Sequence, residues 1–100
     1  MSVSEITANM QERVAKNGGI AGKSVVFDFG DEGAVRIDGT TTPASVSNDN
    51  GPADCRVKVS MADFMEIAQG KQNAQMAFMM GKLKVEGDMS IALQLGKILG

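Results

Sequence analysis

Two short segments of alternating side chains, joined by a four-residue turn, constrain the fold most strongly. The segments are Ser24–Gly30 and Ala34–Asp38, and Gly-Asp-Glu-Gly lies between them at residues 30–33. Successive side chains of a strand point to opposite faces, so this pattern predicts a β-hairpin. Its inward face is expected to carry Val25, Phe27, Phe29, Val35 and Ile37. Its outward face is expected to carry Val26, Asp28, Arg36 and Asp38.

Helix-start and helix-stop signals mark the neighbouring elements. Ser2 with Glu5 is typical of a helix start, and Asn17, before two glycines, of a helix end. Ser60 is expected to cap another helix, with Asp63 in its first turn. The length of 100 residues suits one domain, spanning residues 1–100. The predicted order is a helix to residue 17, strands over 24–30, 34–38 and 44–48, a crossover loop, a strand over 54–60, helices over 61–69 and 73–80, a strand over 82–86 and a final helix over 89–99.

The final segment, residues 89–99, is apolar around most of a helical wheel. Its polar residues, Ser90, Gln94 and Lys97, occupy roughly 60° of the wheel. A surface helix needs one apolar face, so something besides the sheet is expected to cover the second one. The candidates are a bound apolar ligand, another subunit or a lipid surface. The alternative is a helix buried on all sides.

The composition removes most enzyme chemistries. The chain has no His, Trp or Tyr, and Cys55 is its single cysteine. Catalytic triads with His, imidazole metal sites, multi-cysteine zinc sites and an internal disulfide are therefore excluded. Cys55 is expected to be a buried, inert thiol. The acids near the hairpin, Asp28, Asp31, Glu32 and Asp38, are interpreted as a solvated face, so no catalytic residue, metal or cofactor is expected.

Charge and hydropathy bound the partners. The formal net charge is −2, so no basic field is available for a nucleic acid. Residues 55–100 hold four acids and six bases, which favours weak, transient contact with an anionic membrane surface, or is ordinary surface variation. No apolar stretch approaches about 18 residues and no signal-peptide pattern is present, so we expect a cytoplasmic protein.

Methionine is unusually abundant, with eight residues, six of them between Met61 and Met89. Its unbranched thioether side chain fills irregular space, so methionine suits a core or groove that must adapt to its contents. Phenylalanine is the only large aromatic residue, with four copies. The pattern indicates an adaptable apolar interior.

Residues 70–89 read Gly-Lys-Gln-Asn-Ala-Gln-Met-Ala-Phe-Met-Met-Gly-Lys-Leu-Lys-Val-Glu-Gly-Asp-Met. With Pro52–Cys55 before them, and Ser60 followed by Asp63 and Phe64, they resemble the sterol carrier protein 2 family of non-specific lipid-transfer proteins. The resemblance covers residues 22–99 and implies an α+β fold, a five-stranded sheet covered on one face by helices. It also implies a tunnel between sheet and helices for fatty acids, fatty acyl-coenzyme A, sterols or isoprenoids.

With the methionine pattern, the resemblance predicts a set of lipid-binding residues. Gln75 matches a position beside the tunnel, where it is expected to face a ligand head group. The full set is Phe27, Phe29, Phe64, Met65, Gln75, Met76, Phe78, Met79, Met80, Met89, Leu93, Leu95 and Leu99. Leu93 departs from the polar residues that relatives often carry there.

Three functions fit these features. The first is a monomeric, non-enzymatic carrier that binds and transfers a long-chain lipid or acyl-coenzyme A. The second is an accessory protein that presents a lipid or isoprenoid intermediate to a partner enzyme through its C-terminal helix. The third is a dimerising structural module without a ligand.

Overall fold

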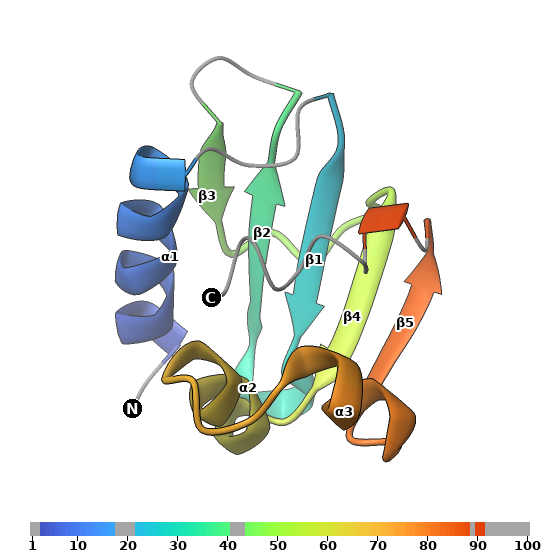
Figure 1. Ribbon diagram of the computed structural model, residues 1–100. Helices are drawn as coiled ribbons and strands as arrows, with labels where there is room; N and C mark the ends of the chain where they lie inside the picture. Colours follow the sequence, from blue (N-terminus) through green and yellow to red (C-terminus); the bar gives the residue numbers. More distant parts are fainter. Residues whose placement is uncertain (1–2, 18–21, 41–43, 89, 92–100) are drawn as a thin grey trace.

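The computed structural model describes residues 3–17, 22–40, 44–88 and 90–91, and their helices and strands follow the predicted order (Figure 1). The elements are α1 (Val3–Asn17), β1 (Ser24–Asp28), a 3-10 turn (Gly30–Glu32), β2 (Ala34–Asp38), β3 (Ser45–Ser47), β4 (Cys55–Val59), α2 (Met61–Ala68), α3 (Ala74–Met79) and β5 (Leu83–Gly87). The predicted helix over residues 89–99 lies outside the described residues except for Ser90 and Ile91.

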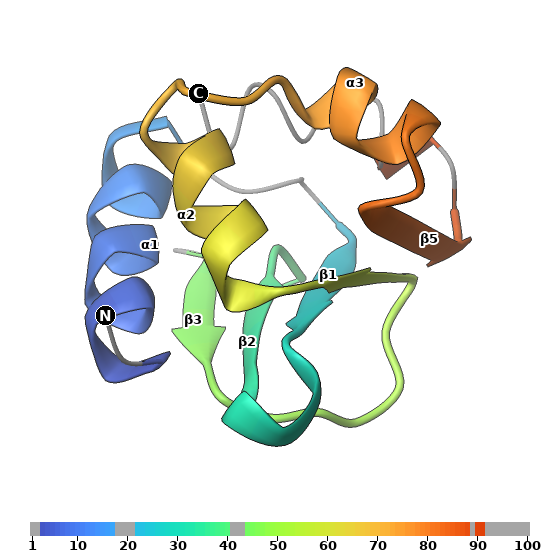
Figure 2. The same ribbon diagram turned by 90° about the horizontal axis from the view of Figure 1, so that it is seen from below.

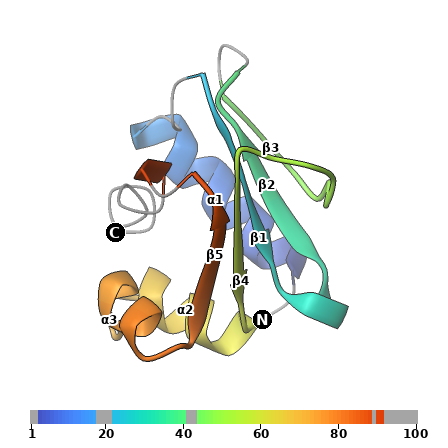
Figure 3. The same ribbon diagram turned by 90° about the vertical axis from the view of Figure 1, so that its right-hand side faces the viewer.

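The five strands form one mixed sheet in the order β3-β2-β1-β4-β5. β1 pairs antiparallel with β2 and parallel with β4, so Phe27 lies between Val35 and Val57 in the register. All three helices lie on the same side of the sheet, as Figure 3 shows from its edge. The predicted α+β architecture is therefore confirmed.

β1 ends at Asp28, earlier than the predicted strand over residues 24–30. The Gly30 N–H donates to the Asp28 carboxylate at 2.8 Å. The Phe29 N–H donates to the Gly33 carbonyl at 2.9 Å, which closes the hairpin. The chain thus leaves the strand at a local side-chain hydrogen bond, a typical use of Asp at a turn.

The core lies between the helices and the inward face of the sheet. All five hairpin side chains predicted to face inward are buried there, and so is Cys55, as predicted. Ile6, Met10 and Val14 contribute the buried stripe of α1. The spacing of these three side chains places them on one helix face, so α1 packs by a single apolar stripe.

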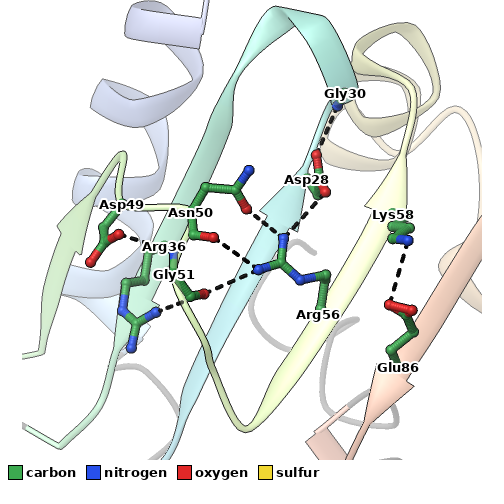
Figure 4. A network of polar contacts seen from close by, with 9 residues as sticks. All are labelled: Asp28, Gly30, Arg36, Asp49, Asn50, Gly51, Arg56, Lys58 and Glu86. Atoms are coloured by element: carbon green, nitrogen blue, oxygen red, sulfur yellow. Dashed lines mark hydrogen bonds and ion pairs between the residues drawn. The ribbon is translucent and has the colours of Figure 1, made fainter.

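The outward face of the sheet is covered in part by the loop that connects β3 to β4 (Figure 4). The Arg36 guanidinium donates to the Pro52 carbonyl at 2.7 Å, and that of Arg56 donates to the Gly51 carbonyl at 3.1 Å. Arg56 also pairs with Asp28 at 3.2 Å. Val26 lies between the two arginines in the register and is fully buried, although it is on the outward face.

Both α2 and α3 end in the same glycine-lysine capping motif. Gly70 and Gly81 follow the helix ends with φ values of +77° and +79°, a left-handed conformation that glycine adopts readily. The next residue then bonds back to the last turn, from Lys71 N–H to the Glu66 carbonyl at 2.8 Å and from Lys82 N–H to the Ala77 carbonyl at 2.9 Å. These bonds define where each helix stops.

Asp88 joins three parts of the chain after β5. Its backbone N–H donates to the Asp54 carbonyl at 2.9 Å, and its carboxylate pairs with Lys23 at 2.7 Å. The same carboxylate accepts the Ser90 N–H at 2.9 Å, which is the capping contact predicted for Asp88. The hydrogen bonds from Lys23 and Ser90 lower the pKa of Asp88 to about 2.

Candidate functional site

The candidate site is a groove between α1 and α2, with a volume of about 360 Å³. Figure 2 shows the two helices side by side. Its lining residues are Ile6, Asn9, Met10, Arg13, Phe64, Met65, Ala68 and Gln69. Five of these eight side chains are apolar, and the volume falls within the range of about 300–1,000 Å³ that is typical of small-molecule sites.

The apolar part of the groove follows from helix periodicity. Ile6 and Met10 are four residues apart on α1, and Phe64 and Ala68 are four residues apart on α2. Residues at this spacing share a helix face, so each helix contributes a continuous apolar strip. Phe64 is anchored from below, because its ring packs edge-on against Phe27, with ring centroids 5.2 Å apart.

Arg13 links the two helices at the groove. Its guanidinium donates to the Ala68 carbonyl at 2.9 Å, near the C-terminal end of α2. A cation at that end interacts favourably with the helix dipole. Asn9 and Gln69 add amide groups to the same lining. The groove therefore combines an apolar surface with one cation and two amides, which suits a long apolar molecule with a polar or anionic end.

The described residues offer little for covalent or metal chemistry. Among them, no group of three Cys, His, Asp or Glu side chains is placed to hold a metal ion. Burial raises the pKa of the Cys55 thiol, so the thiol stays protonated near neutral pH. In the same part of the chain, no helix has the length and hydropathy needed to cross a membrane.

Two of the predicted lipid-binding residues, Phe64 and Met65, line the groove. Phe27 and Phe29 lie below Phe64 in the core, and Phe27 is fully buried. These four come from β1, its turn and α2, and the fold brings them together. Their role as ligand contacts stays a prediction.

The predicted residues of α3 lie elsewhere. The side chains of Gln75, Met76, Phe78, Met79 and Met80 are all exposed, and the structure does not bring them to the groove. The remaining predicted positions, Met89, Leu93, Leu95 and Leu99, lie outside the described residues. Their assignment also stays a prediction.

Sequence reasoning missed the contribution of α1 to the groove. Ile6 and Met10 belong to its apolar stripe, which the sequence shows, but the stripe was interpreted only as a packing face. Asn9 and Arg13 lie beside that stripe on the helix. A polar residue next to an apolar stripe is common on any surface helix, so only the position of α2 identifies these two as groove residues.

A five-stranded mixed sheet with helices on one face, and an apolar groove within the helical layer, defines a class of small α+β domains. The chain belongs to the SCP-2 sterol transfer family, whose model matches residues 3–100. The resemblance stated from the sequence is thereby confirmed.

Among curated relatives, sterol carrier protein 2 of Gallus gallus is 35% identical over 97 residues, covering 91% of this chain and 18% of that protein. Two solved structures are similar over nearly the whole chain. Apo sterol carrier protein 2 from Yarrowia lipolytica has a TM-score of 0.68 and 28% identity, covering 95% of this chain and 77% of that one. Palmitated SCP2L2 from Aedes aegypti has a TM-score of 0.70 and 21% identity, covering 99% and 95%, and this likeness shows the fold alone.

Proposed function

We propose that this chain binds a long acyl chain in the groove between α1 and α2 and carries it without changing it chemically. The observation that carries the proposal is the groove itself, an apolar lining with Arg13 at one side. The chain's membership of the sterol transfer family and its likeness to a palmitated protein support an apolar ligand of this kind. Fatty acids and fatty acyl-coenzyme A fit this description, and a sterol or isoprenoid is the wider alternative.

Phe64 and Met65 are the proposed apolar contacts on α2, with Ile6 and Met10 opposite them on α1. Arg13 is the proposed partner of an anionic head group, because it supplies the cation in the groove lining. Methionine on both walls suits chains of different length and shape, because its side chain adapts to its neighbours. Broad ligand tolerance follows from this lining.

The energetics suit a carrier. Each methylene moved from water to an apolar site gains about 0.8 kcal/mol, so a 16-carbon chain gains about 12 kcal/mol in total. A bilayer offers a similar gain, so transfer between membrane and protein is nearly neutral in free energy. Uptake and release are then both accessible, and no chemical step is needed. Presentation to a partner enzyme through the C-terminal helix involves residues outside the described part of the chain.

Native mass spectrometry of the protein purified from cells tests this proposal. We expect a fraction of the protein to carry a bound molecule with the mass of a long-chain lipid, and denaturation to release it. The lipid should be displaced by excess palmitate and not by excess benzoate, which lacks the long chain. Protein that is ligand-free in every preparation and does not take up palmitate would contradict the proposal.

A further inference from the structure

A patch of large apolar side chains covers the surface of α3. Met76, Phe78, Met79 and Met80 are 60%, 43%, 81% and 64% exposed, and in the described part of the chain they are the exposed large hydrophobic residues. The four residues lie within one short helix and its C-cap, so they form a continuous patch rather than scattered contacts. An apolar patch of this kind marks an interaction surface.

The patch is held rigidly at the edge of the molecule. The Asn73 side chain accepts the Gln75 N–H at 2.8 Å at the start of α3, and the Lys82 N–H closes its end on the Ala77 carbonyl. Ala77 itself is fully buried and anchors the helix. In all three overall views α3 lies at the periphery, so the exposed side chains face away from the core (Figures 1, 2 and 3).

Positive charge adjoins the patch. Two hollows of about 480 and 540 Å³ lie beside β5, and both are lined by Lys58, Gly81 and Lys84. Lys82 completes the lining of the first hollow and Phe78 that of the second. The apolar patch and three ammonium groups therefore share one side of the molecule. Residues 71–85 contain three lysines and no acidic residue.

The acids in these hollows already have partners. Asp28 pairs with Arg56 at 3.2 Å, and Glu86 pairs with Lys58 at 3.5 Å. Within the described part of the chain, neither Lys82 nor Lys84 makes an ion pair. The surface around α3 is therefore left with positive charge to place against an anionic partner.

We propose that α3 and the lysines beside it dock on an anionic phospholipid bilayer. Met79 and Met80 would enter the boundary between head groups and acyl chains, while Lys82 and Lys84 reach the lipid phosphates. Apolar side chains with flanking lysines are the combination that binds such interfaces, and long lysine stems allow the ammonium to stay in the head-group layer. This surface goes beyond the proposed function, because it concerns where the protein meets a membrane rather than what it carries.

The other surface helix does not offer this combination. The buried stripe of α1 faces the core, and its exposed face carries small and polar side chains with Glu5 and Glu12. Acidic residues are repelled by anionic lipid. The proposal therefore assigns membrane contact to α3 and not to α1, which gives the test a matched control on the same protein.

Vesicle sedimentation tests the proposal with two vesicle types, phosphatidylcholine alone and phosphatidylcholine mixed with phosphatidylglycerol. The unaltered chain should bind the mixed vesicles more strongly, and added salt should weaken binding. Lys82→Glu should weaken binding roughly fivefold or more, whereas Lys16→Glu on α1, an equal change of net charge, should leave it unchanged. Met79→Ser with Met80→Ser should weaken it roughly tenfold or more.

The outcomes separate the alternatives. Equal losses in Lys82→Glu and Lys16→Glu would reduce the effect to net charge and overturn the proposal. Absence of vesicle binding, with a concentration-dependent increase in size that the double methionine variant removes, would assign α3 to a protein interface and also overturn it. Ala68→Trp, which fills the groove, should still bind vesicles, so failure here is distinguishable from failure of the proposed carrier function.

Discussion

Replacing Phe64 by Ala lowers the free energy of unfolding by about 3–5 kcal/mol, the usual cost of truncating a large buried aromatic side chain. Phe64 is 2% exposed and packs edge-on against both Phe27 and Phe29, with ring centroids 5.2 and 5.1 Å away. The truncation removes two aromatic contacts and leaves a cavity below α2. A domain of this size has only about 5–15 kcal/mol of stability, so the loss is a large fraction of the total. Urea denaturation followed by circular dichroism measures it.

Met65→Ala is the control on the same helix. Its side chain is half-buried at the groove rather than enclosed in the core, so its truncation should cost less than about 2 kcal/mol. If the two variants lose the same stability, Phe64 does not have the central packing role assigned to it here.

Filling the groove should remove ligand binding without unfolding the protein. Ala68→Trp places an indole ring where the groove is lined by α2, on a side chain that is half-buried. An acyl chain that loses the burial of two methylenes loses about 1.6 kcal/mol, which exceeds a tenfold change in affinity. We therefore expect affinity for a fluorescent fatty acid to fall at least about tenfold.

Ala8→Trp is the matched control, because Ala8 lies on the exposed face of α1 and outside the groove lining. It should bind the fluorescent fatty acid as the unaltered chain does. Unchanged affinity in folded Ala68→Trp, verified by its thermal melting curve, would exclude this groove as the ligand site.

The sequence predicts strands and helices well here because the local signals agree with the final packing. The alternation in Ser24–Gly30 and Ala34–Asp38, and the cap at Ser60, correspond to elements that the structure contains. The expectation for Val26 was incomplete, since the residue lies outward and is nevertheless buried beside Arg36 and Arg56. A long-range loop contact causes this burial, and periodicity carries no information about it.

Burial on α3 shows a second limit of sequence reasoning. Five consecutive apolar residues, Met76 to Met80, predict a helix, and helix α3 spans Ala74–Met79. Only Ala77 of the five is buried, because a helix this short at the edge of the fold has one contact face. Apolar character alone does not distinguish a core helix from a surface that meets a membrane, so the exposed patch emerges only from the three-dimensional arrangement.

The groove shows a third limit, because it forms between elements far apart in the sequence. Met10 and Met65 are separated by 54 residues of chain and line the same hollow. The sequence indicates that each lies on an apolar helix face. Which two helix faces meet is decided by the sheet, whose strand order places α1 and α2 on the same side of the core.

The most direct test of the account is nuclear magnetic resonance of the methionine methyl groups during titration with palmitate. Substitutions Met10→Leu and Met65→Leu assign the two groove signals. Binding in the groove predicts nuclear Overhauser contacts from the Met10 and Met65 methyls to the acyl chain. Contacts confined to the exposed methyls of Met76, Met79 and Met80, with none at Met10 or Met65, would contradict binding between α1 and α2.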